Sequence, residues 1–402
     1  MTEGRPLRVL MMIHTAWSRE LGGPRVQLEL GEELGKLGCE LSKYSYEDAF
    51  PETRRQAFGK LARLAGTLRS NRSFSNRAAA WVRRNAGRFD LIDAHQTDLP
   101  LAKARLGFSG LLVARSVGLI PKYDEFERWA ERRWPQESSF RQGVHRLMTL
   151  PAARRRSRDV LPSFRHADLI NVSNRDDLAT VRDGMGFGDK VVWFPFGISD
   201  GRRSAFDAAA LPPSVRLPAK TVAFIGTWNA RKGCRDWPEI LARLRQREPQ
   251  VKLLLLGTGI PENQVRRDFP AEVQASMTVV PSYASDDLPR LLAGATVGAF
   301  PGYLEGVGFS VLEKIAAGLP TVAYDAPGPR DILGRLPQPV MVSAGDIEAF
   351  SAALAGMLRL PEPAYATLAG HCRQAAATFS WAEIAKATLA TYRERLARLS
   401  AR

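Results

Sequence analysis

The stretch that decides the fold is residues 300–318, FPGYLEGVGFSVLEKIAAG. It follows an apolar run, residues 295–300, that is typical of a strand and ends in a Pro-Gly turn. A glycine-bearing loop comes next. Apolar residues then recur at helical spacing, at Val311, Leu312, Ile315 and Ala316. The stretch therefore predicts a strand, a loop and a helix in that order.

The start of this helix predicts an anion-binding site. The first N–H groups of a helix have no partner within it, and the helix dipole is positive there. We therefore expect a phosphate at Gly308, Phe309 and Ser310. Glu305 precedes this cradle and Glu313 lies one turn inside the helix, and carboxylates accept hydrogen bonds from sugar hydroxyls. The pattern is typical of a nucleotide-sugar site, and an ordinary βα unit with solvated glutamates is the alternative.

Residues 305–318, EGVGFSVLEKIAAG, resemble the Glu-x7-Glu signature of retaining glycosyltransferases with the GT-B fold, in particular glycosyltransferase family 4. The resemblance implies an α/β protein with two Rossmann-like, doubly wound domains that face across a cleft. We expect an acceptor domain at 1–200 and a donor domain at 221–378. Residues 379–402 are expected to form a helix that returns to the N-terminal domain. Residues 201–220 are rich in Arg, Ala and Pro without core periodicity, which predicts a linker.

The chain opens with a second strand, glycine loop and helix. Residues 7–13 are apolar, as in a buried parallel strand, and Gly22 and Gly23 precede apolar residues at helical spacing. In the family this loop approaches the donor diphosphate. The resemblance therefore implies that Gly22 and Gly23 bind the donor, with plain turn chemistry as the alternative.

Two cations are expected at the diphosphate. The family has an arginine directly after a strand-ending glycine and a lysine before the next glycine. Lys232 matches the lysine, whereas Thr227 stands at the arginine position. The sequence leaves open whether Arg231 replaces the missing fork-shaped donor.

On the acceptor side, His95 follows an apolar strand and resembles a family histidine, with a structural histidine as the alternative. Many relatives have a histidine facing the reacting sugar where this chain has Val117, so Arg115 is the best remaining polar candidate. The predicted catalytic residues are Glu305, Lys232, Arg115 and His95. The predicted donor-binding residues are Gly22, Gly23, Arg231, Lys232, Gly306, Val307, Gly308, Phe309, Ser310 and Glu313.

The composition is that of a folded globular protein, since 45% of the 402 residues are hydrophobic and 25% are charged. The 57 Lys and Arg against 42 Asp and Glu favour polyanionic partners. The three cysteines lack metal spacing and indicate a reduced compartment. No Asp-x-Asp pair occurs and the five histidines are scattered, so we expect neither a metal nor another cofactor.

Arg54 to Arg88 form a basic segment in which apolar residues recur, which predicts one or two basic amphipathic helices. We expect contact with an anionic membrane surface here, strengthened by the basic cluster at residues 154–156, and a solvated face is the alternative. The N-terminal stretch lacks a signal-peptide core, so the expected location is the cytoplasm, with membrane association on its cytoplasmic face.

The predicted function is transfer of a hexose, with retained configuration, from a UDP- or GDP-sugar to a hydroxyl of a carbohydrate or lipid-linked acceptor. Such a reaction serves polysaccharide, glycolipid or glycoconjugate synthesis. A GT-B-fold epimerase or phosphorylase is one alternative. A non-catalytic nucleotide-sugar binding module is another, because two expected groups are replaced by Thr227 and Val117. A nucleic-acid binder ranks third, and no nucleic acid partner is expected.

Overall fold

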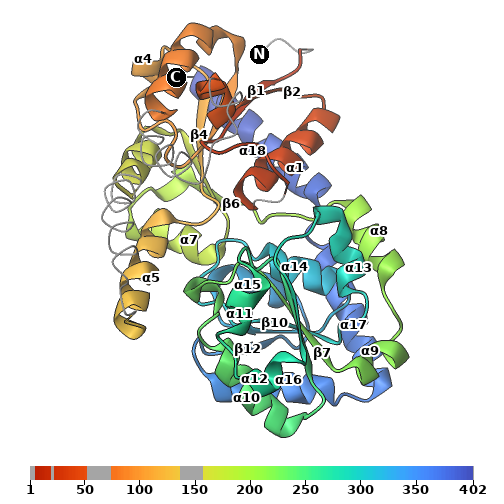
Figure 1. The fold of residues 1–402 in the computed structure, drawn as a ribbon. Helices are drawn as coiled ribbons and strands as arrows, with labels where there is room; N and C mark the ends of the chain where they lie inside the picture. The colour runs from red at the N-terminus through yellow and green to blue at the C-terminus, as the bar shows by residue number, and fades with distance from the viewer. Residues whose placement is uncertain (1–4, 20–21, 52–73, 136–156, 402) are drawn as a thin grey trace. The chain divides into compact units, whose positions relative to one another are not determined.

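The computed structural model describes residues 5–19, 22–51, 74–135 and 157–401 (Figure 1). The chain divides into two compact units. The first consists of Met1–Pro195 together with Trp381–Arg402, and the second is Phe196–Ser380. Each unit contains a six-stranded sheet in which all neighbouring strands are parallel.

The sheet of the first unit has the strand order β2-β1-β3-β4-β5-β6. Its strands are β1 (Arg8–Met12), β2 (Glu40–Tyr44), β3 (Leu91–His95), β4 (Leu111–Arg115), β5 (Leu169–Val172) and β6 (Val191–Trp193). Most of these strands are nearly continuous apolar runs because helices bury both faces of the sheet. The winding of the chain reverses between β1 and β3, which makes this position the switch point of the sheet.

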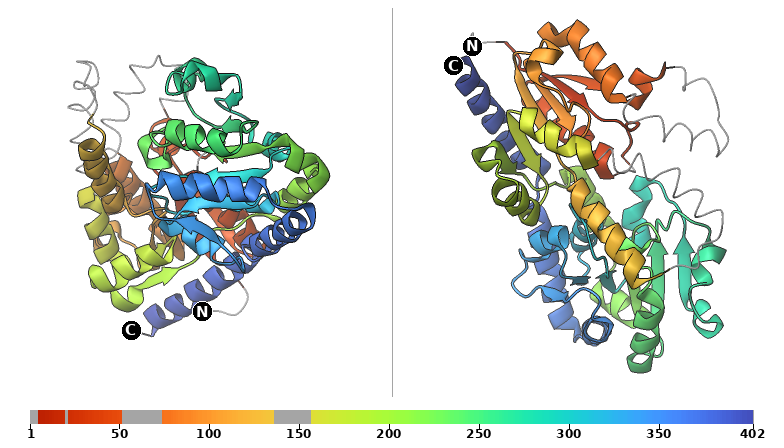
Figure 2. Two further views of the ribbon diagram at one scale, coloured as in Figure 1. Left: turned by 90° about the horizontal axis from the view of Figure 1, so that it is seen from below. Right: turned by 90° about the vertical axis from the view of Figure 1, so that its left-hand side faces the viewer.

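The helices of the first unit connect these strands (Figure 2). Among the described residues, the helical elements of this unit are α1 (Gly22–Lys36), α2 (Tyr46–Ala49), η2 (Ala86–Arg88), α4 (Lys103–Leu106), α5 (Ile120–Arg133), α7 (Arg175–Ala179), η3 (Thr180–Gly184), η4 (Gly188–Lys190) and α18 (Trp381–Ser400), and residues 74–85 and 157–166 are also helical. Helix α1 buries Val26, Leu30 and Leu34 at helical spacing. It is followed by Gly38, whose φ of 84° is the left-handed conformation that glycine favours after a helix.

Helix α18 follows the second unit in the sequence but belongs to the first unit, where it packs against α1 and β4 (Figures 1 and 2). The indole Nε1 of Trp381 donates a hydrogen bond to Glu29 of α1. Further along the helix, Thr388 and Tyr392 are fully buried. Helix α18 is therefore part of the first unit.

The sheet of the second unit has the strand order β12-β11-β10-β7-β8-β9. Its strands are β7 (Thr221–Ile225), β8 (Lys252–Leu256), β9 (Met277–Val280), β10 (Val297–Phe300), β11 (Thr321–Tyr324) and β12 (Val340–Val342). Successive side chains of a strand point to opposite faces. Val222 and Phe224 accordingly join the core on one face, and Ala223 and Ile225 join the core on the other. The switch point lies between β7 and β10.

Helices cover both faces of this second sheet (Figure 2). The helical elements of the unit are α8 (Asp200–Ala209), α9 (Pro213–Ala219), η5 (Ala230–Lys232), α10 (Trp237–Arg247), α11 (Glu262–Arg266), α12 (Ala271–Gln274), η6 (Ser285–Asp287), α13 (Leu288–Leu292), α14 (Phe309–Ala316), α15 (Pro327–Leu333), α16 (Ile347–Leu358) and α17 (Glu362–Ala377).

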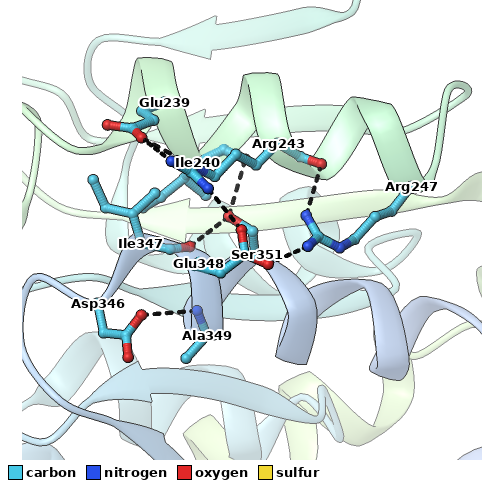
Figure 3. Close-up of polar contacts among 9 residues, drawn as sticks. All are labelled: Glu239, Ile240, Arg243, Arg247, Asp346, Ile347, Glu348, Ala349 and Ser351. Atoms are coloured by element: carbon cyan, nitrogen blue, oxygen red, sulfur yellow. Dashed lines mark hydrogen bonds and ion pairs between the residues drawn. The ribbon is translucent and has the colours of Figure 1, made fainter.

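Figure 3 shows the polar contacts that join α10 to α16 at the rim of this core. Glu348 of α16 accepts hydrogen bonds from Arg243, at 2.7 Å, and from Arg247. The buried hydroxyl of Ser351 donates to the Ile347 carbonyl at 2.7 Å within α16. The arginines and Glu348 are substantially exposed, so water screens their attraction and the packed apolar faces supply most of the stability.

The sequence predicted a linker at residues 201–220, and the structure differs there. These residues form most of α8 and α9, which belong to the second unit. Phe206 is 1% exposed and Arg216 is 2% exposed. The guanidinium of Arg216 donates to the carbonyls of Ala293, at 2.8 Å, and Ala317, at 3.0 Å. The apolar periodicity is weak because these helices are short and one of them buries an arginine instead of an apolar residue.

Most of the basic segment Arg54 to Arg88, predicted to contact a membrane, lies outside the described residues, as does the cluster at residues 154–156. In its described part, residues 74–85 form a helix that buries Phe74, Ala79 and Val82 in the core of the first unit. Across the residues that the structure describes, no helix is both long and apolar enough to span a bilayer.

Candidate functional site

The loops that follow β7 and β10 bring together most of the predicted donor-binding residues. These two strands are hydrogen-bonded neighbours, with Phe224 of β7 opposite Ala299 of β10. Both strands point their carboxyl ends toward the same edge of the sheet. Because the winding reverses between them, the helices that follow, α10 and α14, pack on opposite faces of the sheet. Open α/β sheets bind ligands at such a position.

The loop after β10 is held by close backbone packing. Gly308 is the N-cap of α14 and has φ 89°, a left-handed conformation that a side chain disfavours. Gly328, in the first turn of α15, donates its N–H to the Glu305 carbonyl at 3.2 Å. A Cβ atom at Gly328 would lie 2.6 Å from the Val307 backbone, so only glycine permits this approach. Helix α15 thus supports the segment from Glu305 to Gly308.

The first turn of α14 is the predicted anion cradle. The N–H groups of Val311 and Leu312 already donate to the Gly308 carbonyl, at 2.8 and 3.0 Å. Ser310 is 8% exposed, and its hydroxyl has no hydrogen-bond partner in the described part of the chain. A buried hydroxyl without a partner costs free energy, and an anion accepting a hydrogen bond from it would remove that cost.

Glu305 contacts two cations from the loop after β7. Its Oε2 atom accepts a hydrogen bond from Lys232 Nζ and lies 3.3 Å from Arg231 Nη1. Burial opposes ionisation of Glu305, but the charges of Lys232 and Arg231 hold its pKa below the ordinary value. Burial, with help from Arg231, lowers the pKa of Lys232 against the opposing effect of Glu305. The cluster is therefore a compact group of one anion and two cations at the switch point.

The position of Lys232 follows from the local sequence. The Asn229 side chain accepts a hydrogen bond from the Lys232 N–H at 3.1 Å and so begins the short helix η5. Gly233 ends that helix with φ 82°, and a Cβ there would lie 2.0 Å from the Pro301 carbonyl oxygen. The Tyr303 N–H donates to the Arg231 carbonyl at 2.9 Å. The two loops are therefore in direct contact, which places Lys232 beside Glu305.

Thr227, which stands at the family's arginine position, has a structural contact. Its hydroxyl accepts a hydrogen bond from the Asn229 side chain at 2.8 Å. Arg231 instead reaches the same carboxylate as Lys232, and its Nη1 also donates to the Leu304 carbonyl at 2.9 Å. The second cation of the cluster is thus supplied by Arg231.

Glu313, the second carboxylate of the signature, is paired with an arginine that the sequence did not point to. Glu313 is 5% exposed, and its Oε1 accepts a hydrogen bond from Arg202 Nη2 at 3.0 Å. Arg202 lies on α8, in the segment predicted as a linker, and also donates to the Ser285 carbonyl. The only sequence signal for Arg202 was its place after an N-cap serine, Ser199, which fixes the start of α8.

Lys314, directly after Glu313, is a fully buried amine. Its Nζ donates to the Ala299 carbonyl at 2.6 Å and lies 5.5 Å from the centre of the Phe300 ring. Burial holds the pKa of Lys314 well below its ordinary value, and the charge of Lys232 lowers it further. A Cβ at Gly298 would lie 2.9 Å from the Lys314 side chain, so the glycine provides the room for it.

In the first unit, His95 is the last residue of β3 and lies beside His14, which follows β1. Their rings are 4.8 Å apart, and His14 Nδ1 is 2.8 Å from Asp98 Oδ1. The expectation that the histidines are scattered is therefore wrong for this pair, because strands β1 and β3 are adjacent although 78 residues lie between them in the sequence. Gly22 and Gly23 begin α1, and Gly23 lies near Ile13 at the end of β1.

Arg115 was predicted as a catalytic residue, and the structure corrects this. Arg115 is 1% exposed, and its guanidinium makes three hydrogen bonds to Asp93, the shortest of 2.7 Å, and one of 2.9 Å to Tyr392 of α18. Burial opposes its charge, but Asp93 and Tyr392 hold the pKa of Arg115 above its ordinary value. The side chain is buried and joins α18 to the sheet.

A cavity of about 400 Å³ lies at the opposite edge of the second sheet. It is lined by the amino-terminal ends of β7 and β8, including Thr221 and Lys252, and by the helix ends around Arg245 and Glu272. Parallel sheets bind ligands at the carboxyl ends of their strands. The cavity therefore does not coincide with the candidate site.

Comparison with known proteins supports the reading of this site. Residues 219–359 match the family described as glycosyl transferases group 1. Relatives from Mycolicibacterium paratuberculosis and Mycobacterium avium, both named D-inositol 3-phosphate glycosyltransferase, are each 32% identical over 205 residues, or 48% of this chain. The match covers 43% and 45% of those relatives, so the chain spans less than half of their length.

Solved structures share the fold over nearly the entire chain. Sucrose-phosphate synthase from Thermosynechococcus elongatus superposes with a TM-score of 0.67 at 18% identity, covering 98% of this chain and 100% of that one. Anabaena Alr3699/HepE in complex with UDP-glucose superposes with a TM-score of 0.63 at 16% identity, covering 96% and 100%. The chain therefore has the GT-B fold. Within its second unit, residues 219–359 are similar to the glycosyl transferases group 1 family, in agreement with the resemblance seen in residues 305–318.

Proposed function

We propose that the chain is a retaining glycosyltransferase that moves a hexose from a nucleoside diphosphate sugar to an acceptor hydroxyl. The observation that carries this proposal is the contact of Glu305 with both Lys232 and Arg231 at the switch point of the second sheet. The cluster directly precedes the first turn of α14, where the Ser310 hydroxyl has no partner in the described residues. Two cations, a helix start and a buried hydroxyl suit a diphosphate.

The chemical task of the site is to stabilise the departing diphosphate. In the reaction, the bond between the anomeric carbon and the donor phosphate oxygen breaks, and a bond to the acceptor oxygen forms on the same face of the sugar. Negative charge grows on the diphosphate as its bond breaks. Lys232, Arg231 and the backbone N–H groups from Gly306 to Ser310 are fixed donors that would stabilise that charge. A donor phosphate oxygen would accept the acceptor proton, so no metal or other cofactor is needed.

The two carboxylates are assigned to hydroxyl groups of the donor. Glu305 would bind the hexose hydroxyls, and Glu313, held by Arg202, would bind the ribose hydroxyls. Arg202 then acts as a positioning residue, since it holds the Glu313 carboxylate in place. Gly22 and Gly23 would approach the diphosphate from the first unit, where His95 would contact the acceptor.

The donor and acceptor are proposed by class. The structural neighbour with UDP-glucose favours a UDP-sugar as donor, with a GDP-sugar as the alternative. The acceptor would be a carbohydrate or a lipid-linked saccharide, and the names of the two relatives add an inositol phosphate to that range. We further propose a cytoplasmic location and contact of the segment Arg54 to Arg88 with an anionic membrane surface.

Ligand binding and turnover test the proposal in sequence. A thermal-shift screen of the full chain against UDP, GDP and their sugars should find one base that raises the melting temperature, because a ligand at about 100 times its Kd stabilises by roughly 2.7 kcal/mol. With that donor, Glu313→Ala should raise KM and lower kcat/KM about tenfold or more, since a buried polar contact contributes roughly 1–3 kcal/mol. Donor kinetics equal to those of the unmodified protein would refute the site.

The turnover assay also distinguishes a transferase from a non-catalytic nucleotide-sugar binding module. Release of the nucleoside diphosphate that depends on an added acceptor supports transfer, and analysis of the product's anomeric configuration tests retention. Donor binding without turnover on any acceptor of a broad panel would favour a non-catalytic binding module. Binding of no nucleotide or nucleotide sugar would contradict both functions.

A further inference from the structure

A second group of functional side chains lies in the first unit, at the switch point of its sheet. His14 follows β1, His95 ends β3, and Asp98 lies in the turn three residues later. Strands β1 and β3 are parallel neighbours, with Met12 opposite Ala94. The reversal of winding between β1 and β3 leaves their carboxyl ends open, as at the donor site of the other unit.

The three side chains converge on one point. His14 Nδ1 is 2.8 Å from Asp98 Oδ1, and His95 Nδ1 is 4.0 Å from the same oxygen. One nitrogen or oxygen atom from each residue can be chosen so that all three lie within 4.8 Å of one another. The carboxylate is 1% exposed, whereas the imidazoles are 17% and 13% exposed. A small ion could therefore reach the group from the side of the histidines.

The buried carboxylate has unused capacity to accept an interaction. Oδ1 of Asp98 accepts from His14 and, at 3.4 Å, from the Thr97 hydroxyl. Oδ2 is buried and has no hydrogen-bond partner in the described part of the chain. A buried carboxylate oxygen without a partner is costly, and a cation at this position would remove the cost. This oxygen is the observation that distinguishes the group from an ordinary hydrogen bond between a histidine and an aspartate.

We propose that His14, His95 and Asp98 bind one divalent transition-metal ion, with zinc as the best match. Two imidazoles and one carboxylate suit Zn²⁺, Co²⁺ or Ni²⁺, whereas Mg²⁺ and Ca²⁺ prefer oxygen ligands throughout. Three protein ligands leave a further coordination position open, which is the arrangement of zinc sites that bind a water or a substrate oxygen. Thr97 supports the carboxylate as an outer hydrogen-bond donor. The site belongs to the first unit, whereas the diphosphate cluster belongs to the second, and it includes His95, to which the proposed transfer assigns a contact with the acceptor.

Direct metal binding tests this proposal without donor or acceptor. The full chain, with any affinity tag removed and after dialysis against a chelator, is titrated with Co²⁺ and monitored by visible absorption, then with Zn²⁺ against a chromophoric competitor. We expect one ion per chain, and an intense visible cobalt spectrum that Zn²⁺ abolishes. Binding should weaken as the pH is lowered, because protonated imidazoles cannot bind a metal.

Conservative variants locate the site. Asp98→Asn and His95→Gln should each lower the affinity by at least about tenfold. His371→Gln removes a partly exposed histidine on α17 in the second unit and is the matched control, expected to bind as the unmodified chain does. Circular dichroism of each variant without metal verifies folding, and if one ligand variant fails to fold, the other decides.

Two results would overturn the proposal. One is the absence of stoichiometric binding of either metal near neutral pH. The other is binding that persists in folded Asp98→Asn or His95→Gln, or that is lost equally in His371→Gln, since either pattern assigns the metal to other residues. Because nucleotide binding is a separate measurement on the second unit, failure of this proposal leaves the proposed transferase function standing.

Discussion

The Nη2 atom of Arg202 lies 3.0 Å from Oε1 of Glu313, and the two side chains are only 10% and 7% exposed. The pair joins α8 to the first turns of α14. A buried ion pair is weak support for stability as a whole, but removing one partner leaves an unpaired buried charge. The pair therefore makes the position of Glu313 depend on a helix more than 100 residues earlier in the chain.

A double-mutant cycle measures this dependence. Arg202→Gln should lower the free energy of unfolding more than Arg203→Gln, because Arg203 makes only a partly exposed pair with Asp200. Glu313→Gln should lower the free energy of unfolding much less in the Arg202→Gln background than in the unmodified chain. We expect the difference, measured by urea unfolding, to give a coupling free energy of about 0.5–3 kcal/mol. Additive effects of the two changes would show that the contact is not coupled.

The role of Arg231 in the diphosphate cluster can be tested against a neighbour on the same loop. Arg231→Gln should weaken binding of the matching nucleoside diphosphate by roughly tenfold or more, since a hydrogen bond to a charged group contributes about 1.5–3 kcal/mol. Arg235→Gln removes an exposed arginine four residues later and should leave the affinity within about twofold. Isothermal titration calorimetry gives both values. Equal affinities for the two variants would exclude Arg231 as the second cation.

Tyr392 should stabilise the first unit without affecting the second. Its hydroxyl donates to Asp93 at 2.7 Å and is 2.9 Å from Arg115, and all three side chains are buried. Tyr392→Phe leaves part of this charged group without a partner, so we expect a loss of about 1–3 kcal/mol in unfolding free energy. Nucleotide affinity, measured well below the melting temperature, should not change. A stability equal to that of the unmodified chain would show that the hydroxyl contributes nothing net.

Lys314 makes the stability depend on pH in a defined direction. Burial places the pKa of Lys314 in the folded state below its value in the unfolded state, so the unfolded chain binds this proton more readily. Above the pKa of the unfolded chain, Lys314 is neutral in both states and its ionisation does not affect stability. As the pH falls from there toward the folded pKa, protonation favours the unfolded chain and the free energy of unfolding decreases.

The matching variant is Lys314→Met, which fills a similar volume without an ionisable group. It should be more stable than the unmodified chain at neutral pH, by roughly 1 kcal/mol or more, and the advantage should shrink as the pH rises from about 7 to 10. Denaturant unfolding at several pH values measures the difference. Lys386→Met removes an exposed lysine and is the control, for which no such narrowing is expected. A difference for Lys314→Met that is constant with pH would contradict the assignment.

The parts of the molecule that were predictable from sequence are those encoded by neighbouring residues. The strand, loop and helix around residues 300–318 follow from periodicity and glycine placement, and the family signature gives the fold. Glu305 and Lys232 were predicted to serve one site, and the structure brings them into contact. Their roles in binding remain predictions.

The parts that were missed depend on contacts between distant segments. Nothing near Arg202 in the sequence indicates that it pairs with Glu313, because the helix carrying it is mostly polar and buries only one apolar residue, Phe206. Arg115 was predicted to be catalytic because it is polar. In the structure it is hydrogen-bonded to Tyr392, which lies 277 residues later in the sequence. His14 and His95 are brought together only by the order of strands, which residue spacing does not reveal.

Helix α18 is synthesised after every residue of the second unit, although it packs on the first. On the ribosome, the sheet of the first unit therefore emerges without the helix that carries Trp381 and Tyr392, and the Asp93 and Arg115 charges lack one of their partners during that interval. The second unit is one continuous segment, so all of its strands and helices have been synthesised once Ser380 is added. The order of synthesis thus makes the first half of the chain the last to acquire its full set of contacts, and the half most exposed to chaperones and proteases while the chain is being made.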